Sequence, residues 1–149
     1  MTTVVFGDYK FKIEERDKKQ VIFDISRKKW VPLTPEEWVR QHILHYLIYD
    51  KNYPTSLIAV ERGIELNGLQ KRFDIVVFTN TGLPKMIIEC KAPQELLNEK
   101  VFEQIARYNL SLKVDYLWVT NGGLNFVSRL KGDIQLLEEL PAWDILNES

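Results

Sequence analysis

Three residues that could carry out chemistry lie on two neighbouring apolar segments. Asp74 belongs to the run Arg72-Phe73-Asp74-Ile75-Val76, and fourteen residues separate it from Glu89 in Ile88-Glu89-Cys90-Lys91. Successive side chains of a strand point to opposite faces, so Glu89 and Lys91 share one face of the second segment. If the two segments pair as a hairpin, Asp74 lies near them. Two carboxylates and one amine then converge at one end of a sheet.

This combination suits the hydrolysis of a phosphodiester bond. Oxygen ligands from Asp74, Glu89 and the backbone carbonyl of Cys90 can hold Mg²⁺ and leave positions for water and phosphate. Such a metal polarises the phosphate and lowers the pKa of a bound water, and Lys91 can orient that water or stabilise the developing negative charge. The alternative is a plain Glu89–Lys91 charge pair on a solvated sheet face. Both charges, however, end an apolar strand, where unpartnered charges are rare.

A first helix is predicted from Thr34 to about Tyr49. Thr34-Pro35-Glu36-Glu37 reads as a helix start, with Thr34 as the N-cap and Glu37 completing a capping box. Glu36 lies in register with the apolar stripe of the helix, so we expect it to point toward the core side; the stripe consists of Val39, Ile43, Tyr46 and Leu47. Glu37 is better explained as an acid at the N-terminal dipole.

A second helix is predicted over residues 94–110. Gln104 falls in the stripe of Leu97, Val101 and Tyr108, so it is either a functional polar group on an apolar face or a core glutamine bonded to backbone. On the first helix, His42 and His45 have a spacing that can suit a metal. No third ligand is visible near them, and we interpret them as two surface histidines.

The order of the predicted elements gives the fold class. An N-terminal hairpin over residues 9–25 precedes the first helix; strands follow at residues 57–66, 73–79 and 86–91, with a turn at Asn67-Gly68. After the second helix come a strand at 116–120, a further strand around Phe126 and a short helical or irregular tail with Trp143. Short turns give antiparallel pairs and the helical crossover permits a parallel one, which predicts an α/β fold: a mixed sheet flanked by helices.

Composition sets limits on the class of protein. The chain has 149 residues, 45% hydrophobic and 28% charged, which predicts one globular domain over residues 1–149 with a core at about 34–130. No apolar run is long enough for a membrane span, no secretory signal is visible and Cys90 is the single cysteine, so we expect a reducing, cytoplasmic setting. The net charge of −1 argues against a protein that coats DNA.

The sequence resembles the PD-(D/E)XK nuclease superfamily, and more closely the N-terminal nuclease domain of type I restriction enzyme R subunits in a stand-alone form. The resemblance covers roughly residues 20–130. It rests on Pro35-Glu36-Glu37-Trp38-Val39-Arg40-Gln41, Arg72-Phe73-Asp74-Ile75-Val76, Ile88-Glu89-Cys90-Lys91-Ala92-Pro93, Gln104-Ile105-Ala106-Arg107-Tyr108 (a Gln-x-x-x-Tyr motif) and Tyr116-Leu117-Trp118-Val119-Thr120-Asn121-Gly122.

The resemblance implies a restriction-endonuclease-like fold and a Mg²⁺- or Mn²⁺-dependent deoxyribonuclease, an endonuclease in preference to an exonuclease. Asp74 and Glu89 would bind the metal, Lys91 would assist the attacking water, and Glu36 or Glu37 would supply an acid from the first helix. Gln104 and Tyr108 would position DNA or the metal site. One departure is that the chain has no Gly-x-x-x-x-Gly-Lys-Ser/Thr loop, so any translocation must come from a helicase or translocase partner.

Two other functions stay open. The first is a catalytically weak nucleic-acid-binding subunit that acts beside a helicase or methyltransferase; its candidate phosphate and stacking contacts are Arg27, Lys28, Lys29, Trp30, Lys71 and Arg72. The second is a structural or homodimer-forming domain in which Trp38, Trp118 and Trp143 form an interface, although such aromatic residues are more often core.

Overall fold

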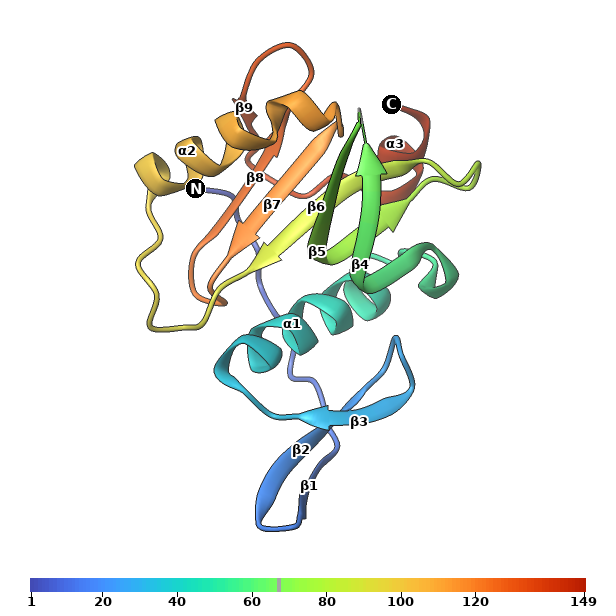
Figure 1. The fold of residues 1–149 in the computed structure, drawn as a ribbon, viewed down its shortest axis with the longest axis vertical. Coiled ribbons are helices and arrows are strands. Elements are labelled where there is room, and N and C mark those ends of the chain that lie inside the picture. Colours follow the sequence, from blue (N-terminus) through green and yellow to red (C-terminus); the bar gives the residue numbers. More distant parts are fainter. Residues whose placement is uncertain (67) are drawn as a thin grey trace.

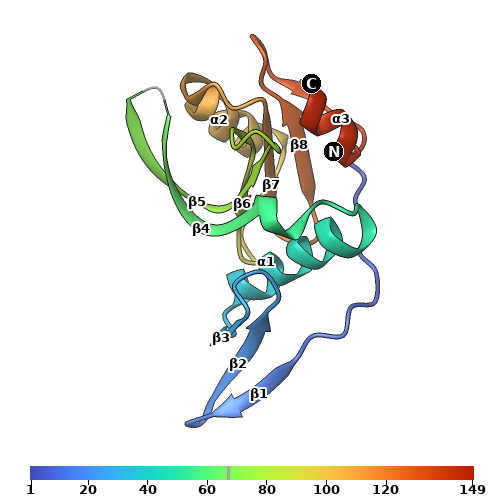
Figure 2. The same cartoon turned by 90° about the vertical axis from the view of Figure 1, so that its right-hand side faces the viewer.

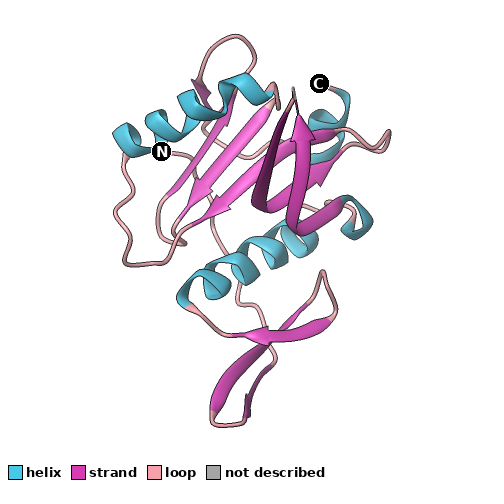
Figure 3. Cartoon of the chain, in the orientation of Figure 1, coloured by secondary structure: helices cyan, strands magenta, loops and turns pink. Residues whose placement is uncertain are grey.

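The computed structural model describes residues 1–66 and 68–149, and in these ranges the chain forms two β-sheets and three α-helices (Figures 1 and 3). The strands are β1 (Ile13–Arg16), β2 (Lys19–Asp24), β3 (Lys29–Pro32), β4 (Ile58–Leu66), β5 (Leu69–Phe78), β6 (Pro84–Cys90), β7 (Tyr116–Thr120), β8 (Asn125–Arg129) and β9 (Gln135–Leu136). The helices are α1 (Pro35–His45), α2 (Glu99–Asn109) and α3 (Trp143–Glu148), with a π-helical turn at Tyr46–Asp50 and 3₁₀ turns at Thr55–Leu57 and Leu110–Leu112.

The larger sheet has the order β4-β5-β6-β7-β8-β9. β6 and β7 run parallel and are joined through α2, while the other neighbouring strands are antiparallel. This confirms the prediction of a mixed sheet flanked by helices. The turn predicted at Asn67 falls outside the described residues.

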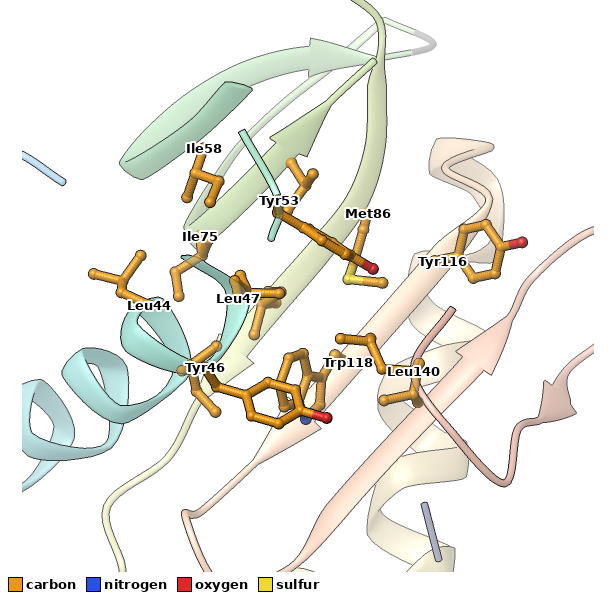
Figure 4. Close-up of a cluster of buried hydrophobic side chains, with 14 of the residues drawn as sticks. Leu44, Tyr46, Leu47, Tyr53, Ile58, Ile75, Met86, Tyr116, Trp118 and Leu140 are labelled. Carbon is orange, nitrogen blue, oxygen red and sulfur yellow. The ribbon is translucent and has the colours of Figure 1, made fainter. Parts of the chain in front are cut away.

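Helices cover both faces of this sheet (Figures 1 and 2). On one face the apolar sides of α1 and α3 pack on β5, β6 and β7, in a core that includes Leu44, Leu47, Ile75 and Trp118 (Figure 4). On the other face α2 contributes Phe102 and Ala106 to a second core. The apolar stripe predicted for the first helix is buried as expected.

The smaller sheet, β1-β2-β3, packs at the outer side of α1 (Figure 1). The predicted N-terminal hairpin exists, but its turn is only Asp17-Lys18, and both residues have positive φ angles of 50° and 64°. A two-residue turn of this kind matches the twist of paired strands, and the charged residues Glu14 to Arg16 all belong to β1. The third strand, around Trp30, was not predicted.

The two long helices begin at side-chain caps. Thr34 Oγ1 accepts a hydrogen bond from the Glu37 N–H (3.0 Å), as predicted from the sequence. The second helix begins at Glu99 and not at residue 94, because Asn98 Oδ1 caps it by accepting from the Val101 N–H (2.8 Å). None of the helices in the described ranges is long and apolar enough to cross a membrane.

Candidate active site

The three residues singled out from the sequence meet at one end of the larger sheet. Antiparallel pairing of β5 with β6 sets Ile75 opposite Ile88, which brings Asp74 to the level of Glu89. The Cys90 N–H donates a hydrogen bond to Asp74 Oδ2 (2.7 Å), and this bond fixes the carboxylate against the end of β6. Lys91 follows directly, held by its own N–H to the Thr120 carbonyl of β7 (2.8 Å).

A cavity of about 430 Å³ opens at this position. Of the predicted site residues it contains Asp74, Glu89, Cys90, Lys91 and Glu36. Its full lining is Glu36, Glu61, Arg72, Phe73, Asp74, Glu89, Cys90 and Lys91. A concave space with several carboxylates and cations is a site for a charged ligand.

Asp74 is partly withdrawn from water. Burial raises the pKa of its carboxyl, while the Cys90 N–H, Arg40 and Lys91 oppose that shift. The second carboxylate oxygen, Asp74 Oδ1, faces Arg40, whose Nη2 lies 3.7 Å away. The charged form of a partly buried carboxylate at a cavity wall is strongly stabilised by a further cation.

The donor set fits a hard divalent cation. Asp74, Glu89 and the Cys90 carbonyl all offer oxygen, and Mg²⁺ is usually held by one or two carboxylates with water completing its shell. In the described part of the chain no three His, Cys, Asp or Glu side chains group closely enough to form a metal site by themselves. Any metal here therefore depends on two carboxylates, backbone and water.

Glu37 is buried and not simply a capping acid, which corrects the sequence interpretation. Its Oε1 lies 3.2 Å from Arg27 Nη2, and its Oε2 lies 3.6 Å from Arg40 Nε and accepts from Gln41 Nε2 (3.1 Å). Arg27 comes from the turn between β2 and β3, a segment whose approach to α1 is not visible in the sequence. Glu36, expected on the core side, is exposed and lines the cavity instead.

Glu61 is a cavity residue that the sequence analysis missed. It lies in β4 with a φ of 50°, a left-handed conformation that is unusual for a residue with a side chain. Three arginines surround its carboxylate: Arg40 Nη1 at 3.1 Å, and Arg27 Nη1 and Arg72 Nη2 at 3.5 Å each. The contact with Arg40 is the main cause of the lowered pKa of Glu61. The only sequence signal was an acidic residue in a β-like segment.

These contacts form an arginine–carboxylate network that consists of Asp24, Arg27, Glu37, Arg40, Glu61 and Arg72. Its centre is Arg40, which is buried. Burial alone would lower the pKa of Arg40, but Glu37, Glu61 and Asp74 raise it above its ordinary value. Arg27, a candidate phosphate contact, is thus occupied by carboxylates, whereas Arg72 is largely exposed at the cavity edge.

Gln104 and Tyr108 do not lie in a buried stripe, and this prediction was wrong. Both are exposed on α2, and neither lines the cavity. The buried stripe is Phe102, Ala106 and Asn109, because the helix starts after Leu97 and its sheet-facing side is set by Phe102. Tyr108 lies under Lys71 of β5, whose Nζ is 4.1 Å from the ring centroid and donates to Asn109 Oδ1 (2.9 Å).

The histidine interpretation also needs correction. His45 is buried, because the N-terminal segment packs the rings of Tyr9 and Phe11 against it; His42 is only partly covered. Of the tryptophans considered for a dimer interface, Trp118 is fully buried in the core, as the core alternative predicted.

Comparison with known proteins gives a family and a fold. The family model of the type I restriction enzyme R protein N terminus (HSDR_N) matches residues 35–142. No curated protein matches the chain in sequence. Among solved structures, a candidate nuclease belonging to DUF820 from Anabaena variabilis ATCC 29413 has the same fold, with a TM-score of 0.51 and 14% sequence identity, over 92% of this chain and 84% of that one.

The family match spans most of the chain and includes α1, α2 and β4 to β9. All the residues that line the cavity at Asp74 fall within it. The solved structure agrees with a mixed sheet flanked by helices in a nuclease-like fold. The chain therefore belongs to the family of the type I restriction enzyme R protein N terminus, with a restriction-endonuclease-like fold.

Proposed function

We propose that this protein is a metal-dependent deoxyribonuclease whose active site is the cavity at Asp74, Glu89 and Lys91. The observation that carries the proposal is the convergence of these three side chains on one cavity, with the Asp74 carboxylate fixed by the Cys90 N–H at 2.7 Å. The family match adds DNA as the expected substrate class, because the family is that of a restriction enzyme component.

In this proposal Asp74, Glu89 and the Cys90 carbonyl hold Mg²⁺ or Mn²⁺. The metal would polarise the scissile phosphate and lower the pKa of a bound water. The Lys91 ammonium stands 3.7 Å from Glu95 Oε2 at the cavity wall, where it can turn toward the attacking water or the developing charge on phosphate. Arg72, exposed at the edge, would contact a neighbouring phosphate of the strand.

Glu36 and Glu37 have different roles in the proposed active site. Glu36 is exposed in the cavity and would be the helix-borne acid, able to accept a hydrogen bond from metal-bound water. Glu37 is committed to Arg27 and Arg40 and would act only by tying α1 to the turn between β2 and β3. Gln104 and Tyr108 would contact DNA, if at all, outside the cavity.

Cleavage of supercoiled plasmid and of a single-stranded oligonucleotide with Mg²⁺ or Mn²⁺ tests the proposal. We expect Asp74→Asn and Lys91→Ala each to lower the rate by about 10²-fold or more, the size of a lost transition-state contact. EDTA should abolish cutting. Asp133→Asn and Lys131→Ala, which change exposed residues of the same type, should cut like the wild type. Cutting that survives both site substitutions would overturn the assignment.

We propose an endonuclease. Supercoiled plasmid has no free ends, so an endonuclease would convert it to nicked and linear forms, whereas an exonuclease would leave it intact. A double-strand cut by one such site would favour a homodimer. Family membership also suggests partners such as a helicase or translocase and a methyltransferase, in a cytoplasmic restriction-modification setting.

A second candidate is a nucleic-acid-binding subunit with weak catalysis. The observation that favours it is Arg40, whose buried charge partly compensates Asp74 and would weaken a metal there. DNA binding that persists in EDTA, with no cutting by the wild type under any condition, would select this function over the first.

A further inference from the structure

A second cavity, of about 550 Å³, lies between the N-terminal segment, β2 and the C-terminal end of α1. Most of its lining precedes residue 35, so it lies largely outside the range that matches the family. It shares no lining residue with the cavity at Asp74. The proposed nuclease function therefore does not account for it.

The cavity combines aromatic walls with cations. Tyr9, Phe23 and Tyr49 supply rings, and Lys10, Lys12 and Lys28 supply three ammonium groups against one carboxylate, that of Asp8. A volume of a few hundred Å³ with apolar walls and few charged groups is the usual form of a small-ligand site. Aromatic walls suit a planar ring, and the excess of cations suits an anion.

The rings and the charges lie within the reach of one ligand. Lys12 Nζ is 5.4 Å from the centroid of the Phe23 ring, so an ammonium group and an aromatic face adjoin each other. Tyr49 is 61% exposed although it is aromatic, and its ring stands 5.6 Å from that of His45. An exposed tyrosine ring beside a buried histidine of the same cavity wall offers a face on which a base can stack.

Two polar side chains of the wall, Tyr9 and His45, each have a hydrogen-bond partner. The Tyr9 hydroxyl donates to Asp50 Oδ2 (2.7 Å), so this neighbouring carboxylate is occupied. Burial lowers the pKa of His45, which favours the neutral ring. Its Nδ1 lies 2.7 Å from the Gln41 carbonyl and must carry the proton to donate there, which leaves Nε2 as an acceptor.

We propose that this cavity binds a nucleotide, with the base against Tyr49 and Phe23 and the phosphate at Lys10 and Lys12. The nucleotide is either a free one or a residue of a single strand, since both present the same ring and anion. His45 Nε2 would accept an N–H from the base. The site is independent of metal, because every group assigned to it acts by stacking, charge or hydrogen bonding.

Binding to the full chain in EDTA tests this proposal separately from cleavage. The probes are dAMP, dTMP, inorganic phosphate and a fluorescent twelve-residue oligo-dT, followed by calorimetry or anisotropy. We expect Tyr49→Ala to weaken binding at least about fivefold, the lower limit for loss of one stacked base, and Tyr49→Phe to retain it. Lys10→Gln with Lys12→Gln should weaken it about tenfold and flatten its salt dependence.

Lys100→Gln with Lys131→Gln, two exposed lysines elsewhere, is the matched control and should bind like the wild type. Binding of dAMP or dTMP identifies a free nucleotide, and binding of oligo-dT alone identifies a strand; either supports the proposal. No binding of any probe, binding unchanged in both cavity variants, or phosphate competing as well as dTMP would overturn it. Asp74→Asn should leave this binding intact, whatever the outcome of the cleavage assay.

Discussion

At the scale of single residues, Asp74 illustrates how a cavity carboxylate costs stability. Its pKa is raised chiefly by burial, so the folded chain holds the proton more tightly than the unfolded chain. Protonation of Asp74 therefore stabilises the folded state. This contribution to the free energy of unfolding is fully present below the ordinary pKa of 3.8 and is lost as the pH rises through the pKa of the folded state. At neutral pH the ionised group therefore destabilises the fold.

We expect Asp74→Asn to raise the free energy of unfolding at pH 7, because asparagine keeps an oxygen for the Cys90 N–H and removes the desolvated charge. The difference from the wild type should shrink as the pH falls toward 4. Urea denaturation between pH 4 and pH 7 measures it. A gain that is equal at every pH would show that the charge of Asp74 is not its cause; Asp133→Asn, on the surface, should show no gain.

Arg40 is the residue whose loss should cost most in the arginine–carboxylate network. Arg40→Met leaves buried Glu37 with one cation fewer and removes the strongest contact of Glu61, so we expect a loss of about 3 kcal/mol in the free energy of unfolding. Arg107→Met, which breaks an exposed pair with Glu103 at 3.0 Å, should lose less than about 1 kcal/mol. Equal losses in urea denaturation would contradict a central role for Arg40.

The sequence was enough to identify residues whose position depends on nearby chain segments, but not those that depend on distant contacts. Asp74, Glu89 and Lys91 depend on two strands joined by a short turn, and strand alternation was enough to bring them together. Glu37 depends on Arg27, and His45 depends on Tyr9, both contributed by the N-terminal segment. Glu61 depends on a left-handed backbone angle in the middle of a strand. The spacing of residues in the sequence predicts neither a distant contact nor such a backbone angle.

At the scale of elements, α1 is the part of the fold that connects the two cavities. Its first turn brings Glu36 to the cavity at Asp74, and His45, at its end, lines the nucleotide cavity proposed above. The local signals of this helix, Thr34-Pro35 at the start and the apolar stripe, predicted it well. Its π-helical end at Tyr46–Asp50 was predicted as ordinary helix, since both forms carry the same apolar residues.

Thr34→Ala tests the start of α1. The substitution removes the oxygen that accepts from the Glu37 N–H at 3.0 Å, and we expect a loss of about 1 kcal/mol in the free energy of unfolding. Thr34→Ser keeps the oxygen and should retain most of the stability. Thermal denaturation of the three proteins measures the effect. If the alanine and serine variants are equally stable, the cap bond contributes little to the helix.

The second helix shows why a periodic pattern can give the right element with the wrong face. The stripe read from Leu97 assumed that Leu97 was helical, but the helix starts only after Asn98. The buried positions of the helix lie one or two residues beyond the predicted Val101, Gln104 and Tyr108. Each residue turns the helix by about 100°, so a shift in the buried positions changes which face is buried. Gln104 was predicted on the buried face and is exposed in the structure.

At the scale of the whole molecule, the first residues close the larger sheet at its far edge. Thr2 is buried, its N–H donates to the Asn125 carbonyl (2.8 Å) and Thr3 forms a bridge to Glu139. The Thr2 hydroxyl donates to the Leu137 carbonyl (2.6 Å) and accepts from the Val127 N–H (2.8 Å). The N-terminal segment thereby ties the C-terminal strands to the side of the molecule that carries the smaller sheet.

Thr2→Val keeps the shape of this side chain and removes its hydroxyl. The buried Val127 N–H and the partly buried Leu137 carbonyl lose their partner, so we expect the free energy of unfolding to fall by about 2 kcal/mol. Thr3→Val, at an exposed side chain whose backbone bonds persist, should change it by no more than about 0.5 kcal/mol. Chemical denaturation distinguishes the two. Similar values would mean that the hydroxyl is not what holds this edge.

The burial of Cys90 has a consequence for how the site can be observed. Its N–H faces Asp74, while its thiol lies in the core between the sheet and α1, where burial raises its pKa well above the ordinary value. It is the one sulfhydryl of the sequence. A reagent can reach it only when α1 moves away from the sheet, so the rate of alkylation measures local opening between α1 and β6. The protein thus carries its own chemical reporter of how firmly α1 covers the end of β6 beside Asp74.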